Sequence, residues 1–180
     1  MTEVLAVHAR NLRRTHHDGE GLHGIDFDVR PGTVVALVGR DPAPTASLVR
    51  ALDGRDHRVE GTLLVSGSRV LIGSEADPAV VARLFGRVLP GSTTRRRVQR
   101  IERALDRKVP LLLLVDPLRD LDETDRSRLV TRLRAAARRD GLAVVLSACD
   151  RDHAALVADR IDVLSDGRIE SSIQVEHPTT

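Results

Sequence analysis

Three short runs of consecutive apolar residues constrain most strongly what this chain can fold into. They are Thr33–Val38, Leu111–Val115 and Ala143–Leu146. A strand with one wet face alternates apolar and polar residues, so an unbroken apolar run of strand length indicates a strand that is covered on both faces. Segments with helical spacing lie between these runs. This order predicts an α/β fold in which helices flank a mainly parallel sheet.

The remaining segments fill in this plan. Val4–Leu12 and Leu22–Val29 are typical of antiparallel strands, and Asp166-Gly167 is the turn of a closing hairpin. The other predicted strands are Leu63–Val65, Arg69–Ile72, Ile161–Leu164 and Arg168–Ile173. The predicted helices are Leu48–Leu52, Pro78–Leu89, Thr93–Leu105, Thr124–Arg139 and Asp152–Ala158.

Composition excludes several classes of protein. With 180 residues the chain predicts one domain, residues 1–175, with a frayed tail at 176–180. No apolar run reaches the roughly 18 residues of a membrane span, and we expect a cytoplasmic protein. Phe27 and Phe85 are the only aromatic residues, which argues against a nucleic-acid partner held by base stacking. A single cysteine excludes a disulfide scaffold and a clustered-thiolate zinc site, and no metal site is predicted.

Three longer segments carry a resemblance to a known family. They are LHGIDFDVRPGTVVALVG, LDRKVPLLLLVDPLRDLDETDRSRL and VVLSACDRDHAALVADRIDVLSDGRI. In type, spacing and order they are similar to the opening, the Walker B and D-loop region, and the switch strand with closing hairpin of ATP-binding-cassette (ABC) nucleotide-binding domains. The resemblance spans roughly Leu5 to Glu170. It implies a P-loop NTPase-like sheet, an N-terminal antiparallel β portion and a helical subdomain, here truncated to a remnant at about 74–105.

The resemblance places a degenerate nucleotide site on the segment after the first apolar strand. A phosphate-binding loop needs glycines that turn amides toward the phosphates, a Lys for the β/γ charge and a Ser or Thr for Mg²⁺. Pro42 and Pro44 stand at two of the glycine positions, and each proline removes an N–H and fixes φ. The site residues are Gly39, Arg40, Asp41, Thr45 at the Lys position, Ala46 at the Mg²⁺-ligand position, Ser47, and His16 near the adenine-stacking position. His16 is alternatively an exposed turn histidine.

No ordinary ATP affinity is therefore expected. Losing three charge-assisted contacts at roughly 1.5–3 kcal/mol each removes an amount comparable to the roughly 8 kcal/mol of micromolar binding. We expect no cofactor, with ATP and Mg²⁺ binding only if the changes are compensated.

The other catalytic positions depart from the family pattern as well. Val115 stands at the metal-linked Asp. Asp116 is a shortened stand-in for the general-base Glu, the metal ligand itself if the alignment slips by one residue, or a carboxylate that caps the strand end. Cys149 stands at the switch His and is predicted to be a buried, inert thiol. Ser92 is either a remnant phosphate contact or a helix N-cap.

Partner-facing residues follow from the same resemblance. They are Ser92, Arg95, Arg96, Arg100 and Asp122. Together with Arg97 and Arg103, the three arginines form a basic stripe at helical spacing. This stripe is either a docking surface or a solvated face paired with Glu102 and Asp106.

Three hypotheses remain. The first is a pseudo-ATPase that serves as a cytoplasmic subunit or scaffold of a membrane transporter-like complex, beside an ABC paralogue or a transmembrane protein. The second is a weak or composite ATPase that works as a heterodimer with an active ABC subunit. The third is a regulatory binder of an anionic surface, such as the inner face of the membrane, through the arginine-rich helix. A dimer is compatible with each.

Overall fold

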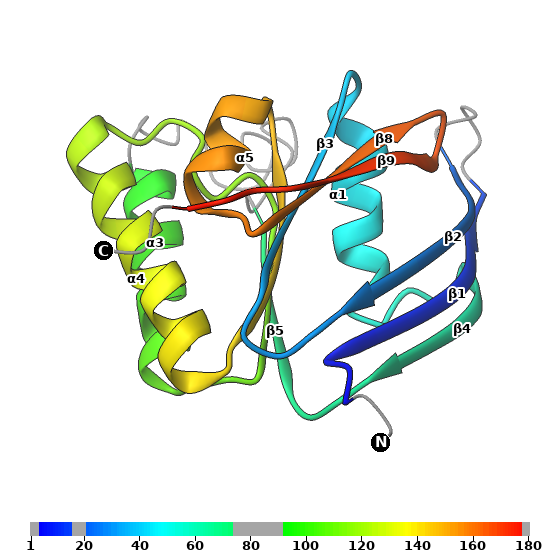
Figure 1. Cartoon of the computed structure of the whole chain (residues 1–180), viewed down its shortest axis with the longest axis horizontal. Helices are drawn as coiled ribbons and strands as arrows, with labels where there is room; N and C mark the ends of the chain where they lie inside the picture. Colours follow the sequence, from blue (N-terminus) through cyan, green and yellow to red (C-terminus); the bar gives the residue numbers. More distant parts are fainter. Residues whose placement is uncertain (1–3, 16–20, 74–91, 178–180) are drawn as a thin grey trace.

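The structure, a computed structural model, describes residues 4–15, 21–73 and 92–177 (Figure 1). Its elements in chain order are β1 (Val7–Arg14), β2 (Leu22–Val29), β3 (Val34–Gly39), α1 (Pro42–Ala51), β4 (Val59–Val65), β5 (Arg69–Ile72), α3 (Ser92–Asp106), β6 (Leu111–Leu114), α4 (Glu123–Asp140), β7 (Ala143–Ala148), α5 (Arg151–Val157), β8 (Arg160–Ser165) and β9 (Arg168–Gln174).

Two sheets organise the molecule. The larger has the strand order β5-β6-β7-β3-β8-β9, parallel from β5 to β8 and antiparallel at β9. The smaller is antiparallel, with the order β2-β1-β4. Helix α1 lies between the two sheets, whereas α3, α4 and α5 cover the opposite face of the larger sheet (Figure 1). The predicted α/β fold with an N-terminal antiparallel portion is confirmed.

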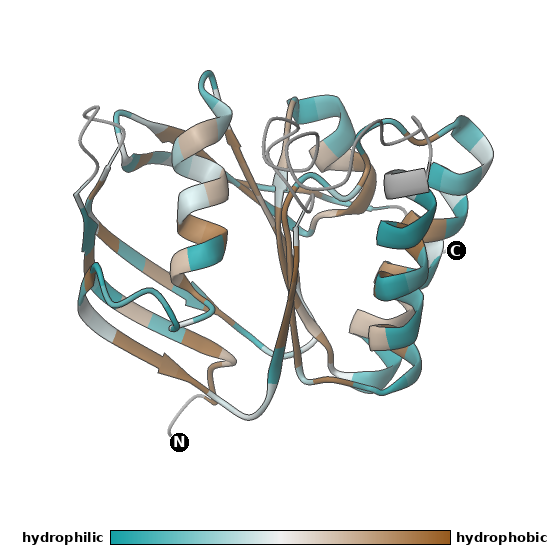
Figure 2. Ribbon diagram, turned by 180° about the vertical axis from the view of Figure 1, so that it is seen from behind, coloured by the Kyte–Doolittle hydropathy of each residue, from teal (hydrophilic) through white to brown (hydrophobic). Residues whose placement is uncertain are grey.

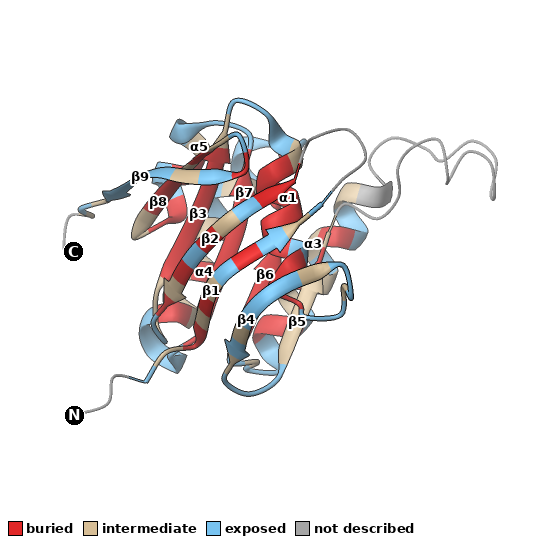
Figure 3. Ribbon diagram, turned by 90° about the vertical axis from the view of Figure 1, so that its right-hand side faces the viewer, coloured by how far each residue is buried: buried red, intermediate tan, exposed pale blue. Residues whose placement is uncertain are grey.

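The apolar runs are explained by two cores on either side of the larger sheet. Val34, Ala36 and Val38 of β3 face the core under α3, α4 and α5. Val35 and Leu37, the alternate residues, face the core that contains α1 and the small sheet. Strands β6 and β7 divide their residues in the same way. The central strands are therefore almost entirely apolar, Ser147 of β7 being polar (Figure 2), and they are buried along their length, in contrast to the exposed edge strand β4 (Figure 3).

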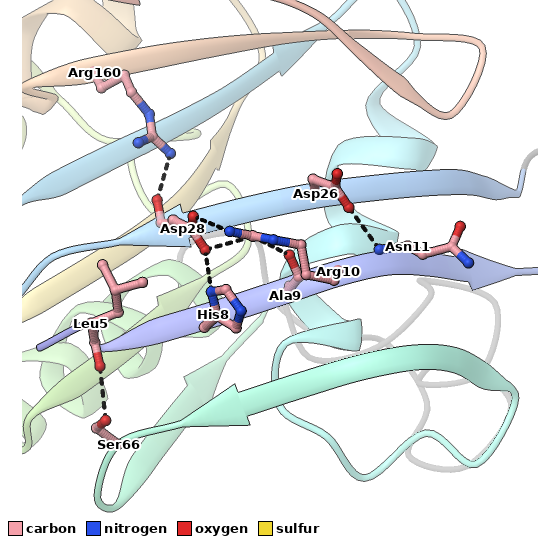
Figure 4. A network of polar contacts seen from close by, with 9 residues as sticks. All are labelled: Leu5, His8, Ala9, Arg10, Asn11, Asp26, Asp28, Ser66 and Arg160. Carbon is pink, nitrogen blue, oxygen red and sulfur yellow. Dashed lines mark hydrogen bonds and ion pairs between the residues drawn. The ribbon is translucent and has the colours of Figure 1, made fainter. Parts of the chain in front are cut away.

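A charged network holds the small sheet together (Figure 4). The Asp28 carboxylate accepts two hydrogen bonds of 2.7 Å from the Arg10 guanidinium, and His8 Nδ1 lies 2.8 Å from Oδ1. The bonds from Arg10 hold the pKa of Asp28 below its usual value, against the opposing effect of partial burial. Arg160 of β8 donates to the Asp28 carbonyl at 3.0 Å and lies over the Phe27 ring, which ties this sheet to the larger one.

Several element boundaries differ from the sequence-based expectation. Helix α1 begins at Pro42 and not at Leu48, because Asp41 is its N-cap and a proline suits the first helical turn. Helix α5 begins at Arg151, with Asp150 as N-cap. The expected helix Pro78–Leu89 lies outside the described residues.

At the carboxyl-terminal end, His177 Nε2 lies 2.9 Å from the Ala158 carbonyl oxygen. The chain therefore stays against the body of the protein two residues beyond the predicted end of the domain. Within the described ranges, no helix is long and apolar enough to cross a membrane.

Candidate functional site

The candidate site lies at the carboxyl ends of three neighbouring parallel strands. Val38 of β3 pairs with Ala148 of β7, and Leu114 of β6 pairs with Leu146 of β7. The segments that follow these strands therefore emerge at one edge of the sheet, which is the edge where open α/β sheets place their ligands. This arrangement brings the β3–α1 junction, Asp116 and Cys149 to the same edge.

The β3–α1 junction is a tight turn whose polar groups bond within the turn. The Asp41 carboxylate accepts the N–H of Ala43 at 2.9 Å and so caps α1. The Thr45 hydroxyl donates to the Pro42 carbonyl at 2.8 Å. Gly39 has a steric reason to be glycine, because a Cβ there would lie 2.8 Å from the Leu164 carbonyl oxygen. The positive end of the α1 dipole is thus already matched by a carboxylate of the chain itself.

The predicted site residues at this junction separate into buried and exposed groups. Thr45, Ala46 and Ser47 are buried, and Ala46 belongs to the core around α1. Ser47 Oγ accepts a long hydrogen bond of 3.4 Å from Arg14. Arg40 and Asp41 remain exposed. His16 lies outside the described residues.

Asp116 follows β6 and is bound to the neighbouring strand. Its backbone N–H donates to Ser147 Oγ at 3.0 Å, and that hydroxyl lies 3.2 Å from Asp116 Oδ1. The backbone of Asp116 has φ +45°, a left-handed conformation that Asp adopts more readily than most residues. These contacts fix the carboxylate at the end of the strand, which is what the capping alternative requires. A role as general base remains a prediction.

The β7–α5 junction gathers three side chains that can bind a metal ion. Cys149 Sγ lies 3.3 Å from Asp150 Oδ2 and 3.6 Å from His153 Nδ1, and the last two atoms lie 2.7 Å apart. The expectation of a buried Cys149 is wrong, because the residue comes directly after the last residue of β7 and is exposed. Sequence reasoning missed this cluster. The usable signal was the four-residue spacing of Cys149 and His153 across a helix start, where Asp150 is a suitable N-cap.

Electrostatics at this junction favour a protonated thiol and an ionised carboxyl. Partial burial raises the pKa of the Cys149 thiol, and the carboxylates of Asp150 and Asp116 raise it further. The backbone N–H of His153 lowers the pKa of Asp150, and the contacts with Cys149 and the His153 ring act in the same direction. Asp116, Ser147, Cys149 and His153 line one small cavity. The Asp116 side of the edge therefore faces the cysteine cluster.

The arginines of helix α3 differ in their exposure to solvent. Arg95 and Arg96 are exposed and form no ion pair with any described residue, and Arg100 is half-buried. Arg97, by contrast, is 8% exposed and donates to the Arg119 carbonyl oxygen. The expected stripe is therefore interrupted, because Arg97 turns toward the loop after β6. Burial lowers the pKa of its guanidinium.

The acids expected to pair with this stripe contact α4 instead. Glu102 lies 3.4 Å from Arg128 and 3.3 Å from Arg132, and Asp106 lies 2.7 Å from Arg132. These pairs join the two helices and leave the exposed arginines of α3 to other contacts.

Two further predicted partner-facing residues lie at helix starts. Asp122 is exposed and is the N-cap of α4. Its carboxylate accepts a hydrogen bond of 2.8 Å from the N–H of Asp125. Ser92 is the first residue of α3, and its side chain lies outside the described part of the structure.

The sequence of this chain is similar to those of one group of known proteins. The aliphatic sulfonates import ATP-binding protein SsuB 1 of Frankia alni is 32% identical over 201 residues, which cover 95% of this chain and 75% of that protein. SsuB 2 of Rhizobium johnstonii is also 32% identical, over 97% of this chain and 83% of its own length. No family model matches the chain.

Solved structures agree in fold. The ATP-binding cassette MJ0796, in a dimeric post-hydrolysis state bound to ADP and Pi, has a TM-score of 0.70 at 16% identity and covers 95% of this chain and 99% of its own. Structure cbiO1 of Clostridium perfringens, part of the ABC transporter complex cbiONQ, has a TM-score of 0.67 at 18% identity, with coverages of 94% and 88%. Together with the sequence relatives, they show that this chain belongs to the ATP-binding-cassette family of transporter ATP-binding subunits.

Proposed function

We propose that this chain is a catalytically degenerate ABC subunit, a pseudo-ATPase that serves as a cytoplasmic subunit or scaffold of a membrane transporter complex. The observation that carries the proposal is the Asp41 carboxylate at the N-terminus of α1, 2.9 Å from the Ala43 amide. In this fold that helix end would offer free N–H groups to a phosphate. Here it carries a negative charge that repels one.

The residues at the β3–α1 junction do not fit the phosphates of a nucleoside triphosphate. Pro42 and Pro44 have no N–H to donate, and the Thr45 hydroxyl is 1% exposed and already bonded to the Pro42 carbonyl. Ala46 offers no oxygen to Mg²⁺. Arg40 is the one cation among the predicted residues here, and it is exposed rather than enclosed.

The partners are inferred from the family and from one surface. The relatives are named import ATP-binding proteins, which supports an ABC paralogue or a transmembrane protein as the partner, at the inner face of the membrane. Arg95 and Arg96, exposed on α3, supply charge for an acidic partner surface. This position would let the subunit contribute binding surface where an active relative contributes hydrolysis.

Titration calorimetry of the purified chain with Mg-ATP tests the proposal. We expect no binding heat up to millimolar nucleotide. A variant carrying Asp41→Ser, Pro42→Gly, Pro44→Gly, Thr45→Lys and Ala46→Ser serves as the matched control, because it restores the amides, the cation and the hydroxyl at the same helix end. Binding by that variant alone supports the proposal. A dissociation constant of the native chain below about 100 μM would overturn it.

A second candidate is a composite ATPase, favoured by the ATP-binding names of the relatives and by Ser92 at the start of α3. In that case a partner subunit would supply the hydrolytic groups. A mixture with that partner would hydrolyse ATP, and Ser92→Arg would abolish the activity. Hydrolysis that is indifferent to this substitution rejects the composite site.

The third candidate, regulation through an anionic surface, is favoured by the exposed charges of α3. Charge reversal by Arg96→Glu and Arg100→Glu would then reduce binding to anionic vesicles. Unchanged binding to vesicles and to protein partners rejects this role.

A further inference from the structure

The β7–α5 junction holds a thiol, an imidazole and a carboxylate whose ligand atoms all lie within 4.8 Å of one another. They come from Cys149, directly after β7, and from Asp150 and His153 at the start of α5. The end of a buried strand fixes the first residue. The N–H of His153, which donates to Asp150 Oδ1 at 2.7 Å, fixes the other two relative to each other. The cluster is therefore built on rigid elements and not on a long loop.

Two of the three separations are close to those around a tetrahedral metal ion. With metal–sulfur and metal–nitrogen bonds of about 2.3 and 2.0–2.1 Å, tetrahedral geometry places S and N about 3.5–3.6 Å apart. Cys149 Sγ and His153 Nδ1 are 3.6 Å apart. The sulfur and the Asp150 oxygen are 3.3 Å apart, also near the tetrahedral value of about 3.5 Å. The imidazole–carboxylate pair, at 2.7 Å, must open by roughly 0.7 Å to reach the tetrahedral separation of about 3.4 Å.

We propose that Cys149, Asp150 and His153 form a binding site for a borderline-soft divalent cation of the Zn²⁺ type. A thiolate and an imidazole select such an ion over Mg²⁺ and Ca²⁺, which require oxygen ligands. One thiolate and one carboxylate balance the two positive charges of the ion. The thiol releases its proton to solvent as the sulfur–metal bond forms, and the imidazole binds through its neutral Nδ1.

Water completes the coordination. The small cavity beside the cluster is lined by Asp116 and Ser147 as well as by Cys149 and His153. A fourth ligand position toward this side would hold water within reach of polar groups. Asp116, itself anchored by Ser147, adds negative charge on that side of the ion. The proposal does not depend on the absence of ATP binding at the β3–α1 junction, which involves other residues.

Titration of the full-length, tag-free chain with Co²⁺ tests the site. A thiolate bound to Co²⁺ gives an intense ligand-to-metal charge-transfer absorption, and Cys149 is the single cysteine of the chain. We expect this absorption to saturate at one Co²⁺ per chain and to disappear on addition of Zn²⁺. Absence of the absorption, or saturation at a fraction of the chains, would overturn the proposal.

Matched variants separate this site from adventitious binding. Cys149→Ser should abolish the absorption. His153→Gln should weaken Co²⁺ binding by at least 10–100-fold, because loss of a residue that merely hydrogen-bonds to a metal ligand already costs that much affinity. Asp150→Ser keeps an N-cap for α5 but removes the carboxylate, and we expect an intermediate loss. His57→Gln, at an exposed position before β4, is the control and should change nothing. Binding of Zn²⁺ that persists unchanged in Cys149→Ser, or that fails in this control, would contradict the proposal.

Discussion

The β3–α1 and β7–α5 junctions lie at the same edge of the sheet, yet they use their polar groups in opposite ways. At the first, Asp41 and Thr45 bond to backbone groups of the same turn, and Ala46 and Ser47 after them are buried. At the second, Cys149, Asp150 and His153 bond to one another and stay at least partly exposed. Both helices begin with an aspartate N-cap.

The difference lies in the residues that come after each cap. After Asp41 come two prolines, which have no N–H to donate, and then Thr45–Ser47, which are buried, with Ala46 in the core around α1. After Asp150 comes a turn that places an imidazole back over the cap and the preceding thiol. If both proposals hold, this chain has lost the residues of one polar site while its fold assembles another at the neighbouring strand end.

Both junctions depend on the buried strand β7, so the largest expected effect is the loss of stability when a core residue of this strand is truncated. Leu146 of β7 is fully buried in the core under α4 and α5. Leu146→Ala should lower the free energy of unfolding by about 2–5 kcal/mol, because it removes buried apolar area and leaves a cavity. Urea denaturation measures the loss. Leu64→Ala, at a position that is 62% exposed, is the control and should stay within about 0.5 kcal/mol of the native chain.

Loss of the Asp41 cap of α1 should lower stability by less, and it tests one junction alone. Asp41→Ala should reduce the free energy of unfolding by about 0.5–2 kcal/mol, because the Ala43 amide loses its partner. Asp41→Ser keeps a capping oxygen and should recover most of that loss. Thermal denaturation monitored by circular dichroism distinguishes the two variants. Equal stability of Asp41→Ala and the native chain would show that this carboxylate does not support α1.

How far sequence predicts such a molecule depends on the kind of residue. The strand at Val34–Gly39 and the hairpin around Asp166-Gly167 are predictable from local pattern, since continuous apolar residues and a turn pair that tolerates positive φ each have few structural solutions. The predicted start of α1 at Leu48 was wrong because Asp41 caps the helix and Pro42 suits its first turn, before the apolar residues with helical spacing begin.

The polar sites are less predictable because they depend on contacts between elements. The burial of Arg97 requires the loop after β6, where it donates to the Arg119 carbonyl, and no helical pattern reveals that loop. The cavity beside Cys149 likewise requires β6 and β7 to be neighbours, so that Asp116 and Ser147 meet. Spacing along the chain predicts only that Cys149 and His153 lie together, and not that Asp116 and Ser147 line the same cavity.

The smallest expected effect concerns a charge that lies at neither junction. Asp28 has a lowered pKa in the folded chain, chiefly because Arg10 donates to it. Its contribution to stability is therefore fully present above the usual aspartate pKa of about 3.9 and is lost as the pH falls through the lowered value. Asp28→Asn should be less stable than the native chain at neutral pH, and the difference should close on acidification. Denaturation across acidic pH measures it, and a difference independent of pH would contradict the assignment.

The position of β3 at the centre of the larger sheet sets the order in which the chain can be completed during synthesis. Its partners are β7 and β8, and its first amide donates to Asp159, 125 residues further along. Until the ribosome has released those strands, β3 has nothing to pair with. Pairing between strands so distant in sequence favours slow folding, and it leaves this apolar strand uncovered while the chain is incomplete.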